Sequence, residues 1–225
     1  MQTSVTDRSL VLCSAGLDSA VLVALEARER RVLPVYVSVG LAWEAGERAA
    51  LERLLPALGL GDRVASAAHL TVDMRDVYPA AHWAVRGTPP RYDSPDEEVY
   101  LEGRNIVLLS KASVLAARER ITRVAIGPLA GNPFPDATGE FFGAMARALS
   151  IGLDHPIDVV TPLASCHKAD VIRLGRDLGV PLELTLSCMN PQDGRHCGRC
   201  SKCRERRDGF RDAAVEDRTV YVTTS

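Results

Sequence analysis

The stretch Leu10-Val-Leu-Cys-Ser-Ala-Gly-Leu-Asp-Ser19 passes from apolar residues through small residues into the beginning of an amphipathic segment. Residues 9–14 are an apolar run bounded by polar residues, which predicts a buried strand. Residues 17–29 follow at once, and their apolar side chains fall on one helical face: Leu17, Ala20, Val21, Ala24 and Leu25. We therefore expect a strand that leads directly into a helix.

The same alternation continues along the chain. We expect strands over residues 31–39, 64–72, 123–126 and 158–161, and helices over residues 44–58, 105–119, 140–151 and 168–178. Because parallel strands need a crossover between them, this order predicts a Rossmann-like α/β fold with a parallel sheet of about five strands. Ligands of such folds bind beyond the carboxyl ends of the strands. Residues 86–99, rich in Pro, Asp and Glu, predict a mobile surface loop.

The composition favours one compact core and a small-molecule substrate. Of the 225 residues, 46% are hydrophobic and 25% charged, which suits one α/β domain over residues 1–180 with a tail over residues 181–225 packed on it. The 27 basic and 29 acidic residues nearly cancel, so we expect no nucleic-acid partner. No apolar stretch reaches the roughly 20 residues that span a bilayer. The first residues lack a secretory pattern, so we expect a cytoplasmic protein without membrane contact.

The small residues Ser14, Ala15 and Gly16 lie between the expected strand and helix, where backbone N–H groups and the helix dipole converge on an anion. They let phosphate oxygens approach the main chain, although the turn matches neither a Walker loop nor GxGxxG. The turn is therefore predicted to bind phosphate. An ordinary turn with Asp18 and Ser19 as helix caps fits the spacing equally well.

Four cysteines near the end of the chain, Cys188-x8-Cys197-x2-Cys200-x2-Cys203, have the spacing of a metal site. A shell of four thiolates leaves no open position for water, so we expect structural Zn²⁺ that pins the tail. The alternatives are a redox pair or an iron–sulfur cluster, with His196 as a substitute ligand. The basic residues around the cluster suit a nucleic-acid patch or, as we prefer, a solvated surface: Arg195, Arg199, Lys202, Arg204, Arg206 and Arg207.

Residues 14–19 resemble the SGGxDS loop of the ATP pyrophosphatase (PP-loop) superfamily, whose members cleave ATP to AMP and pyrophosphate while they activate a carbonyl as its adenylate. Ala15 stands where that motif usually has its first glycine, and alanine is tolerated there if its φ stays negative. With the cysteine cluster, the chain is similar to the 7-cyano-7-deazaguanine synthase family of queuosine biosynthesis. Further matching pieces are Glu102-Gly-Arg-Asn105, Pro133-Phe-Pro-Asp136, Glu140-Phe141, Thr161-Pro-Leu163, Lys168-Ala169, Ser187-Cys188 and Gly209-Phe210.

This resemblance implies an adenine nucleotide alpha hydrolase-like fold and an enzyme that is an ATP-dependent carbon–nitrogen ligase. It would adenylate 7-carboxy-7-deazaguanine, let ammonia form the amide, and activate the amide again to give the nitrile. ATP would be a cosubstrate, Mg²⁺ would neutralise the departing pyrophosphate, and a homodimer is implied. The residues implied to bind ATP are Leu12, Ser14, Ala15, Gly16, Leu17, Asp18, Ser19, Asn105 and Gly127. The residues implied for catalysis are Asp18, Ser19, Arg104 and Lys168. The residues implied to bind the substrate are Arg104, Phe134 and Asp136.

Each implied residue also has a plain structural interpretation. Arg104 and Lys168 suit phosphate oxygens, or surface ion pairs. Asn105 suits the nucleotide, or an N-cap. Asp136 is placed to accept hydrogen bonds from a guanine-like N–H edge, or is a turn aspartate, and Phe134 either stacks on a purine or plugs the core.

The chain departs from the family pattern around the substrate. Val37-Ser-Val-Gly-Leu-Ala-Trp43 replaces the usual aromatic-Asp-Tyr-Gly-Gln segment, and Asn132-Pro-Phe-Pro-Asp-Ala-Thr138 replaces a Gly-Tyr-Pro-Asp-Cys-Arg loop. Glu102 also takes the place of a usual proline. ATP-dependent activation is therefore a safer prediction than the identity of the activated acid.

Two rival functions fit the same motifs. One is a PP-loop enzyme that adenylates a different carboxylate or transfers sulfur to tRNA. A sulfur transferase needs a reactive cysteine pair outside the metal shell, where only Cys13, expected in the core, and Cys166, expected in a loop, remain. The other rival is a nucleotide-binding or zinc-dependent interaction module without catalysis.

Overall fold

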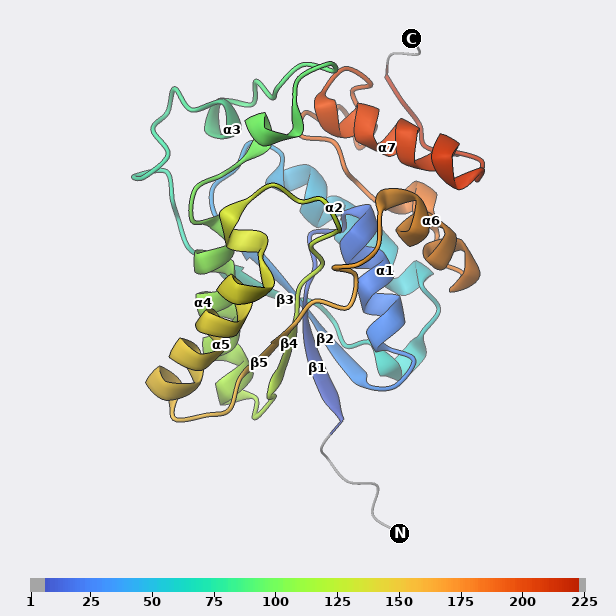
Figure 1. Cartoon of the computed structure of the whole chain (residues 1–225). Helices are drawn as coiled ribbons and strands as arrows, with labels where there is room; N and C mark the ends of the chain where they lie inside the picture. The colour runs from blue at the N-terminus through green and yellow to red at the C-terminus, as the bar shows by residue number, and fades with distance from the viewer. Residues whose placement is uncertain (1–6, 223–225) are drawn as a thin grey trace.

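The computed structural model describes residues 7–222 and contains a five-stranded parallel sheet (Figure 1). The strands are β1 (Arg8–Leu12), β2 (Arg31–Ser38), β3 (Ala68–Thr71), β4 (Arg123–Ala125) and β5 (Asp158–Val160), in the order β3-β2-β1-β4-β5. The chain thus builds the sheet outward from β1 on one side and then on the other. Ligands bind where such an order reverses, here beyond the carboxyl end of β1. The predicted fold class is confirmed.

Helices cover both faces of the sheet. They are α1 (Leu17–Glu26), α2 (Glu44–Ala57), α3 (Trp83–Arg86), α4 (Arg104–Arg118), α5 (Gly139–Leu153), α6 (Lys168–Asp177) and α7 (Ser201–Ala213). In Figure 1, α4 and α5 lie on one side of the sheet and α1 and α6 on the other. The last helix, α7, packs against α6 and crosses the edge at which the strands end. This edge is therefore enclosed by the two helical layers and the tail.

Two segments differ from the sequence prediction. The third strand is shorter than expected, since Val64 makes only an isolated bridge with Val32 before β3 begins at Ala68. Residues 86–99, predicted as a free surface loop, are fixed to the tail, because Arg91 bridges Cys200 and the Arg204 guanidinium donates to the carbonyl of Ser94 at 2.8 Å. Contacts with a distant segment of the chain, which local composition does not encode, hold this loop.

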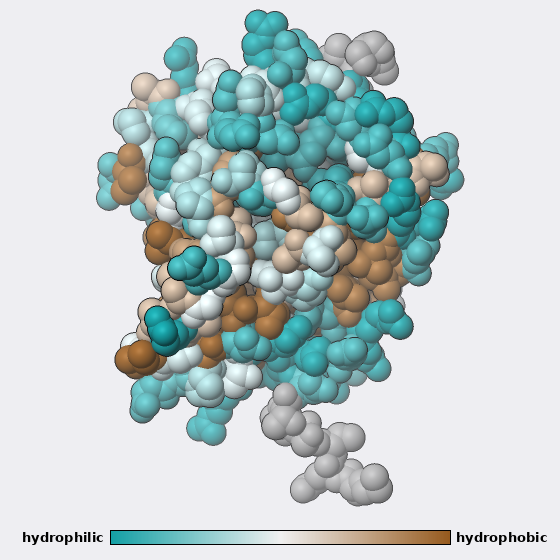
Figure 2. Space-filling view, in the orientation of Figure 1, coloured by the Kyte–Doolittle hydropathy of each residue, from teal (hydrophilic) through white to brown (hydrophobic). Residues whose placement is uncertain are grey.

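The apolar core is centred on β1, where Leu10 and Val11 are fully buried. It extends without a break into the tail, since Leu186 and Phe210 belong to the same cluster of buried residues. Figure 2 shows a mainly hydrophilic surface over α7. Within residues 7–222, no helix has the length and apolar character needed to cross a membrane.

A buried ion pair joins α1 to β4. Glu26 is 3% exposed, and its two carboxylate oxygens each accept a hydrogen bond of 2.9 Å from the Arg123 guanidinium. Burial alone raises the pKa of Glu26, but the hydrogen bonds and charge of Arg123 outweigh it, so that the pKa is lowered from its ordinary value of 4.5. The ion pair therefore stabilises the fold fully above about pH 4.5, the ordinary pKa of a glutamate. This stabilisation is lost as the pH falls through the lower pKa of Glu26 in the folded protein.

We expect Arg123→Met to lower the free energy of unfolding at pH 7 by about 3 kcal/mol, because Glu26 is left buried without its partner. The pKa of Glu26 is then raised by burial, so stability should increase as the pH falls from 7 toward 5, a range in which the wild-type pair contributes no change. Urea denaturation at several pH values measures this. As a control, Arg30→Met removes a cation 4.0 Å from Glu26 and should cost less than about 1 kcal/mol. Equal losses in the two variants would contradict the assignment.

Candidate active site

The turn between β1 and α1 leaves the first N–H groups of the helix open. Gly16 is the N-cap of α1, and no side chain caps it. The Ser19 hydroxyl instead donates to the carbonyl of Gly16 at 3.0 Å, and Asp18 is engaged elsewhere. The alternative in which Asp18 and Ser19 cap the helix is therefore wrong. Open N–H groups at a helix start, together with the helix dipole, suit an anion.

Ala15 adopts a left-handed backbone conformation with φ of 60°, so the condition of a negative φ is not met. Its side chain is fully buried, and its carbonyl accepts a hydrogen bond of 2.8 Å from the amide of Leu186 in the tail. A left-handed alanine costs about 1–2 kcal/mol. The tail hydrogen bond and the burial hold this residue in a conformation that glycine adopts without strain.

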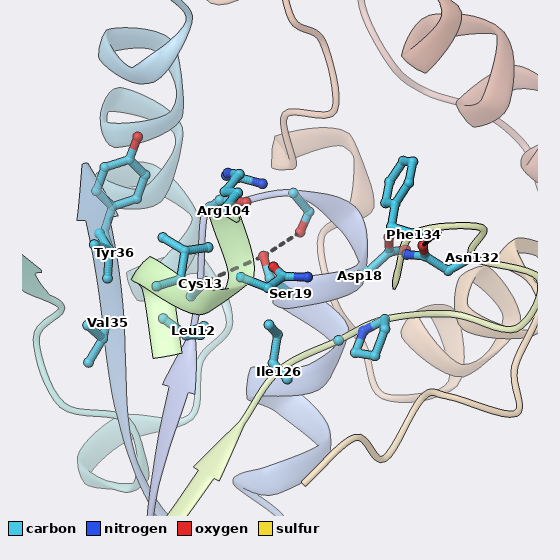
Figure 3. Close-up of a pocket in the computed structure, with 17 residues that line it drawn as sticks. Leu12, Cys13, Asp18, Ser19, Val35, Tyr36, Arg104, Ile126, Asn132 and Phe134 are labelled. Atoms are coloured by element: carbon cyan, nitrogen blue, oxygen red, sulfur yellow. Dashed lines mark hydrogen bonds between the residues drawn. The ribbon is translucent and has the colours of Figure 1, made fainter. Parts of the chain in front are cut away.

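A first cavity of about 280 Å³ lies beyond the carboxyl ends of β1, β2 and β4 (Figure 3). Its apolar wall includes Leu12, Val35 and Ile126, and the turn contributes Ser14, Gly16, Asp18 and Ser19. Figure 3 shows Tyr36 on one flank and Phe134 with Asn132 on the other. Of the residues predicted for the nucleotide, Leu12, Ser14, Gly16, Asp18, Ser19, Asn105 and Gly127 line this cavity, whereas Ala15 and Leu17 do not.

A second cavity of about 270 Å³ lies between the turn, α2, α3 and the tail. The residues that line it include Trp43, Glu47, Trp83, Lys168, Ser187, Lys202, Glu205 and Arg206. Both cavities share residues of the turn, Ser14, Gly16 and Asp18, together with Arg104 and Phe134. Each volume lies just below the roughly 300 Å³ at which small-molecule sites begin, and the two together exceed it. The turn therefore separates two adjoining compartments.

Arg104 lies at the boundary of the two cavities, in the first turn of α4. It follows Gly103, whose φ of 72° is left-handed and suits glycine. A cation at a helix N-terminus opposes the helix dipole, so this arginine weakens α4 locally. Its buried Nε has no hydrogen-bond partner among the described residues. An anion in either cavity would satisfy it.

Lys168 joins three helices by ion pairs. Its Nζ lies 2.6 Å from Oδ2 of Asp18 and 2.8 Å from Oε1 of Glu205, and Lys202 lies 2.5 Å from the other oxygen of Glu205. Burial lowers the pKa of Lys168, but the two carboxylates outweigh it and the pKa is raised. Burial raises the pKa of Glu205, yet Lys168 and Lys202 lower it to about 2. Lys168 and Glu205 therefore both stay charged near neutral pH.

The loop after β4 supplies Phe134 and Asp136. Phe134 stacks on Tyr100 at a ring distance of 5.0 Å and lines both cavities. Asp136 is 6% exposed and lines neither cavity; its Oδ2 accepts from the backbone N–H of Asn105 at 3.1 Å. Asn105 is not the N-cap of α4, which is Gly103. Its side chain donates to the carbonyl of Asp136 at 2.9 Å. The pair thus ties the loop to α4.

Sequence reasoning missed several residues of the second cavity, above all Glu47. This carboxyl lies on the face of α2 that also buries Ala50, Leu51 and Leu54. Glu47 is 8% exposed, and its Oε2 accepts a hydrogen bond of 2.8 Å from the Tyr36 hydroxyl. A glutamate within the apolar stripe of an amphipathic helix is the signal that could have found it.

The four cysteines of the tail could hold a metal ion. Their sulfur atoms all lie within 4.8 Å of one another, and Cys188–Cys200 and Cys197–Cys203 are 4.0 and 3.9 Å apart. Four thiolates around one tetrahedral ion would stand about 3.8 Å apart. Backbone N–H groups of Asn190 and Cys197 point at the sulfur of Cys188, at 3.3 and 3.2 Å, which suits a thiolate. His196 is not among these ligands, since its Nε2 accepts from the amide of Ser187.

The basic residues around the cluster are largely bound within the protein. Arg206 is 2% exposed and donates to Thr185, Ser187, Thr219 and the carbonyl of Leu182. Arg207 packs over the Tyr221 ring at 4.1 Å, and Arg204 pairs with Asp96 at 2.9 Å. Neither a nucleic-acid patch nor a freely solvated surface describes these three residues. They join the tail to the domain.

A family model described as queuosine biosynthesis protein QueC matches residues 8–214 of the chain. The chain belongs to the QueC family. Two relatives, each named 7-cyano-7-deazaguanine synthase, are 35% identical: that of Methanothrix thermoacetophila over 95% of this chain and 98% of its own length, and that of Anaeromyxobacter dehalogenans over 98% of both. A 4-thiouridine synthetase solved with RNA and bound ATP covers 92% of this family member and 51% of its own chain, at 12% identity and a TM-score of 0.47.

We expect Ala15→Gly to change the free energy of unfolding by less than about 1 kcal/mol. Relief of left-handed strain offsets the added freedom of glycine in the unfolded chain. Ala20→Gly, at a fully buried position in the interior of α1, has no such relief and should lose about 1 kcal/mol or more. Urea denaturation of both variants measures the difference, and equal losses would contradict the left-handed conformation of Ala15.

We expect Cys200→Ser to release the metal ion and to lower stability by about 4 kcal/mol or more, as the loss of a structural metal does. In a chain of this size that corresponds to roughly 10 °C in the melting temperature. Elemental analysis and a thermal melt measure both. Cys166→Ser, in a loop outside the cluster, is the control and should keep the metal. Full metal content in Cys200→Ser would show that the shell is assigned wrongly.

Proposed function

We propose that this chain converts 7-carboxy-7-deazaguanine and ammonia to 7-cyano-7-deazaguanine, through an adenylated carboxylate and an amide, with release of AMP and pyrophosphate. The observation that carries the proposal is the pair of adjoining cavities that share the turn and Arg104, in a member of the QueC family. One compartment suits a nucleotide and the other a small acid. Their common boundary is where an α-phosphate and a carboxylate would meet.

The chemistry explains why two compartments are needed. A carboxylate is a poor electrophile, so its oxygen must become a phosphate ester before nitrogen can attack the carbon. ATP would lie in the first cavity, with its phosphates over the open N–H groups of α1. Arg104, whose Nε lacks a partner, would bind phosphate oxygens, and Lys168 would supply a second positive charge. Mg²⁺ would neutralise the departing pyrophosphate, with Asp18 as its ligand.

The acid would lie in the second cavity against an aromatic wall. Trp43 and Trp83 stack with their rings 5.8 Å apart and 12° from parallel, and both line this cavity. Trp43 ends the segment that departs from the family pattern, so the wall is a feature of this chain. A flat deazapurine can pack on such a surface. We still propose Asp136 as the residue that accepts hydrogen bonds from the N–H edge of the acid. Its carboxylate here accepts from the backbone N–H of Asn105 in α4, so this role requires the loop after β4 to move.

We further propose that the metal is structural Zn²⁺, because four thiolates complete a tetrahedral shell without an open position. A homodimer remains a proposal that rests on the family resemblance alone. The six free cysteines suit the reducing cytoplasm.

The test is to incubate the metal-loaded protein with ATP, Mg²⁺, ammonium and the deazaguanine acid, and to detect AMP, amide and nitrile by mass spectrometry. We expect Asp18→Asn to lower AMP formation by about 100-fold or more, because a charge that binds the metal is lost. Asp62→Asn is the control, since Asp62 is 88% exposed and lies in the short turn Gly61–Arg63, away from both cavities. Full AMP formation by Asp18→Asn would contradict the role of Asp18.

The rival functions give different results in the same assay. AMP that forms only with another acid indicates a different carboxylate substrate, and no AMP with any acid indicates a binding module. A sulfur transferase is disfavoured, because Cys13 is buried and burial raises the pKa of its thiol.

A further inference from the structure

Glu47 is a buried carboxyl that the proposed reaction has not yet used. It lies in the first turn of α2 and lines the second cavity, opposite the turn that carries Asp18. Its helical neighbours on the same face belong to the apolar core. A carboxyl in such a place costs stability unless a cation or several N–H donors compensate it. Its retention there therefore calls for an explanation in the chemistry of the cavity.

Glu26, Glu205 and Glu44 each have a cation or two backbone N–H donors as partners, which Glu47 lacks. Glu26 is paired with Arg123, Glu205 with Lys168, and Glu44 accepts from the backbone N–H groups of Val39 and Gly40 at 2.7 and 3.0 Å. Glu47 accepts a hydrogen bond from the neutral phenol of Tyr36 and interacts with the neutral side chain of Trp43, and within residues 7–222 it forms no ion pair. Its carboxyl group can therefore exchange a proton with a ligand in the cavity.

The groups that face Glu47 set its proton affinity. Burial raises the pKa, Arg104 from α4 lowers it, the hydrogen bond from Tyr36 on β2 lowers it, Glu44 on its own helix raises it, and Trp43 lowers it; the result is about 7. Cys13 at the end of β1 is neutral, because burial raises its pKa. Across the cavity stand further charged groups: Asp18, Lys168, Lys202, Glu205 and Arg206. A group of this pKa holds and releases a proton near neutral pH.

The proposed reaction needs such a group. Ammonia enters from water as ammonium, and its nitrogen must lose a proton before its lone pair can form the C–N bond. As that bond forms, the nitrogen loses a second proton, the carbon–oxygen bond to AMP breaks, and AMP leaves with the electron pair. In the second round, the nitrogen of the adenylated amide loses its two remaining protons as AMP leaves and the nitrile forms. The adenylation steps release no proton from nitrogen. A base is thus needed only after each activation.

We propose that the carboxylate of Glu47 is the base that takes these protons from nitrogen and passes them to water. The inference rests on the proposed function and goes beyond it by naming the residue for the nitrogen steps. Alternatives within the cavities are weak: Asp18 and Glu205 are held by Lys168, and none of the five histidines lines either cavity. Glu47 is left as the carboxyl in the acid's compartment with an available oxygen.

The test compares Glu47→Gln with Tyr36→Phe in two assays. Exchange of labelled pyrophosphate into ATP, with the acid but without ammonium, reports adenylation alone and should stay within about 3-fold in both variants. Amide formation should fall roughly 100-fold to 10,000-fold in kcat for Glu47→Gln, with the KM for the acid little changed. Tyr36→Phe keeps the carboxylate and should keep most of the amide formation.

The pH profile gives an independent readout. Amide formation by the wild type should decline as the pH falls below about 7, where Glu47 takes up a proton. Tyr36→Phe removes a hydrogen bond that lowers this pKa, so the decline should begin at higher pH. When every rate is measured at the same concentration of free ammonia, Glu47→Gln should lose the decline altogether. Glu47→Asp retains a carboxylate. We expect it to form amide at a reduced rate that still declines as the pH falls.

Several results would overturn the proposal. If Glu47→Gln loses pyrophosphate exchange as strongly as amide formation, or raises the KM for the acid at unchanged kcat, Glu47 binds the acid and is not the base. If Glu47→Gln does not fold, as judged by circular dichroism, Glu47→Asp decides, and a pH-independent rate from it rejects the base. Failure of the proposed function is separate, because the wild type itself would then form neither amide nor nitrile.

Discussion

The arrangement of the site depends on the ammonium of Lys168, which lies between the carboxylates of Asp18 and Glu205. These residues come from the beginning of α6, the beginning of α1 and the middle of α7, so one cation fixes the turn and the tail against each other. The hydrogen bond from Leu186 to the carbonyl of Ala15 adds a second link between the same two parts. The second cavity exists because the tail is held at this distance from the turn.

The fold could be predicted from the sequence because its signals are local. The apolar run before the turn and the helical periodicity of residues 17–29 lie within a few residues of each other, and the alternation of strands and helices predicts a parallel sheet. The spacing of the four cysteines likewise predicted a cluster of possible metal ligands, and in the structure their sulfur atoms lie within 4.8 Å of one another.

What the sequence could not predict depends on contacts between distant segments. The φ of Ala15 is positive because β1, α1 and the tail all fix that residue, and a local motif does not contain the tail. Asp136 was expected at a ligand but holds the first turn of α4, 31 residues earlier in the chain. Glu47 was missed because a glutamate in an amphipathic helix usually lies on the solvent-exposed face, whereas this one occupies the apolar face of α2.

Both Asp18 oxygens lie against Lys168, at 2.8 and 2.6 Å, so a divalent cation that binds this carboxylate must compete with the ammonium for it. The ammonium would keep its contact with Glu205, which belongs to α7. A metal ion can therefore take the place of the ammonium at Asp18 while α7 stays attached to α6 through the Lys168–Glu205 ion pair. The freed positive charge would then stand beside the incoming metal, where only an anion of several charges could hold the two together.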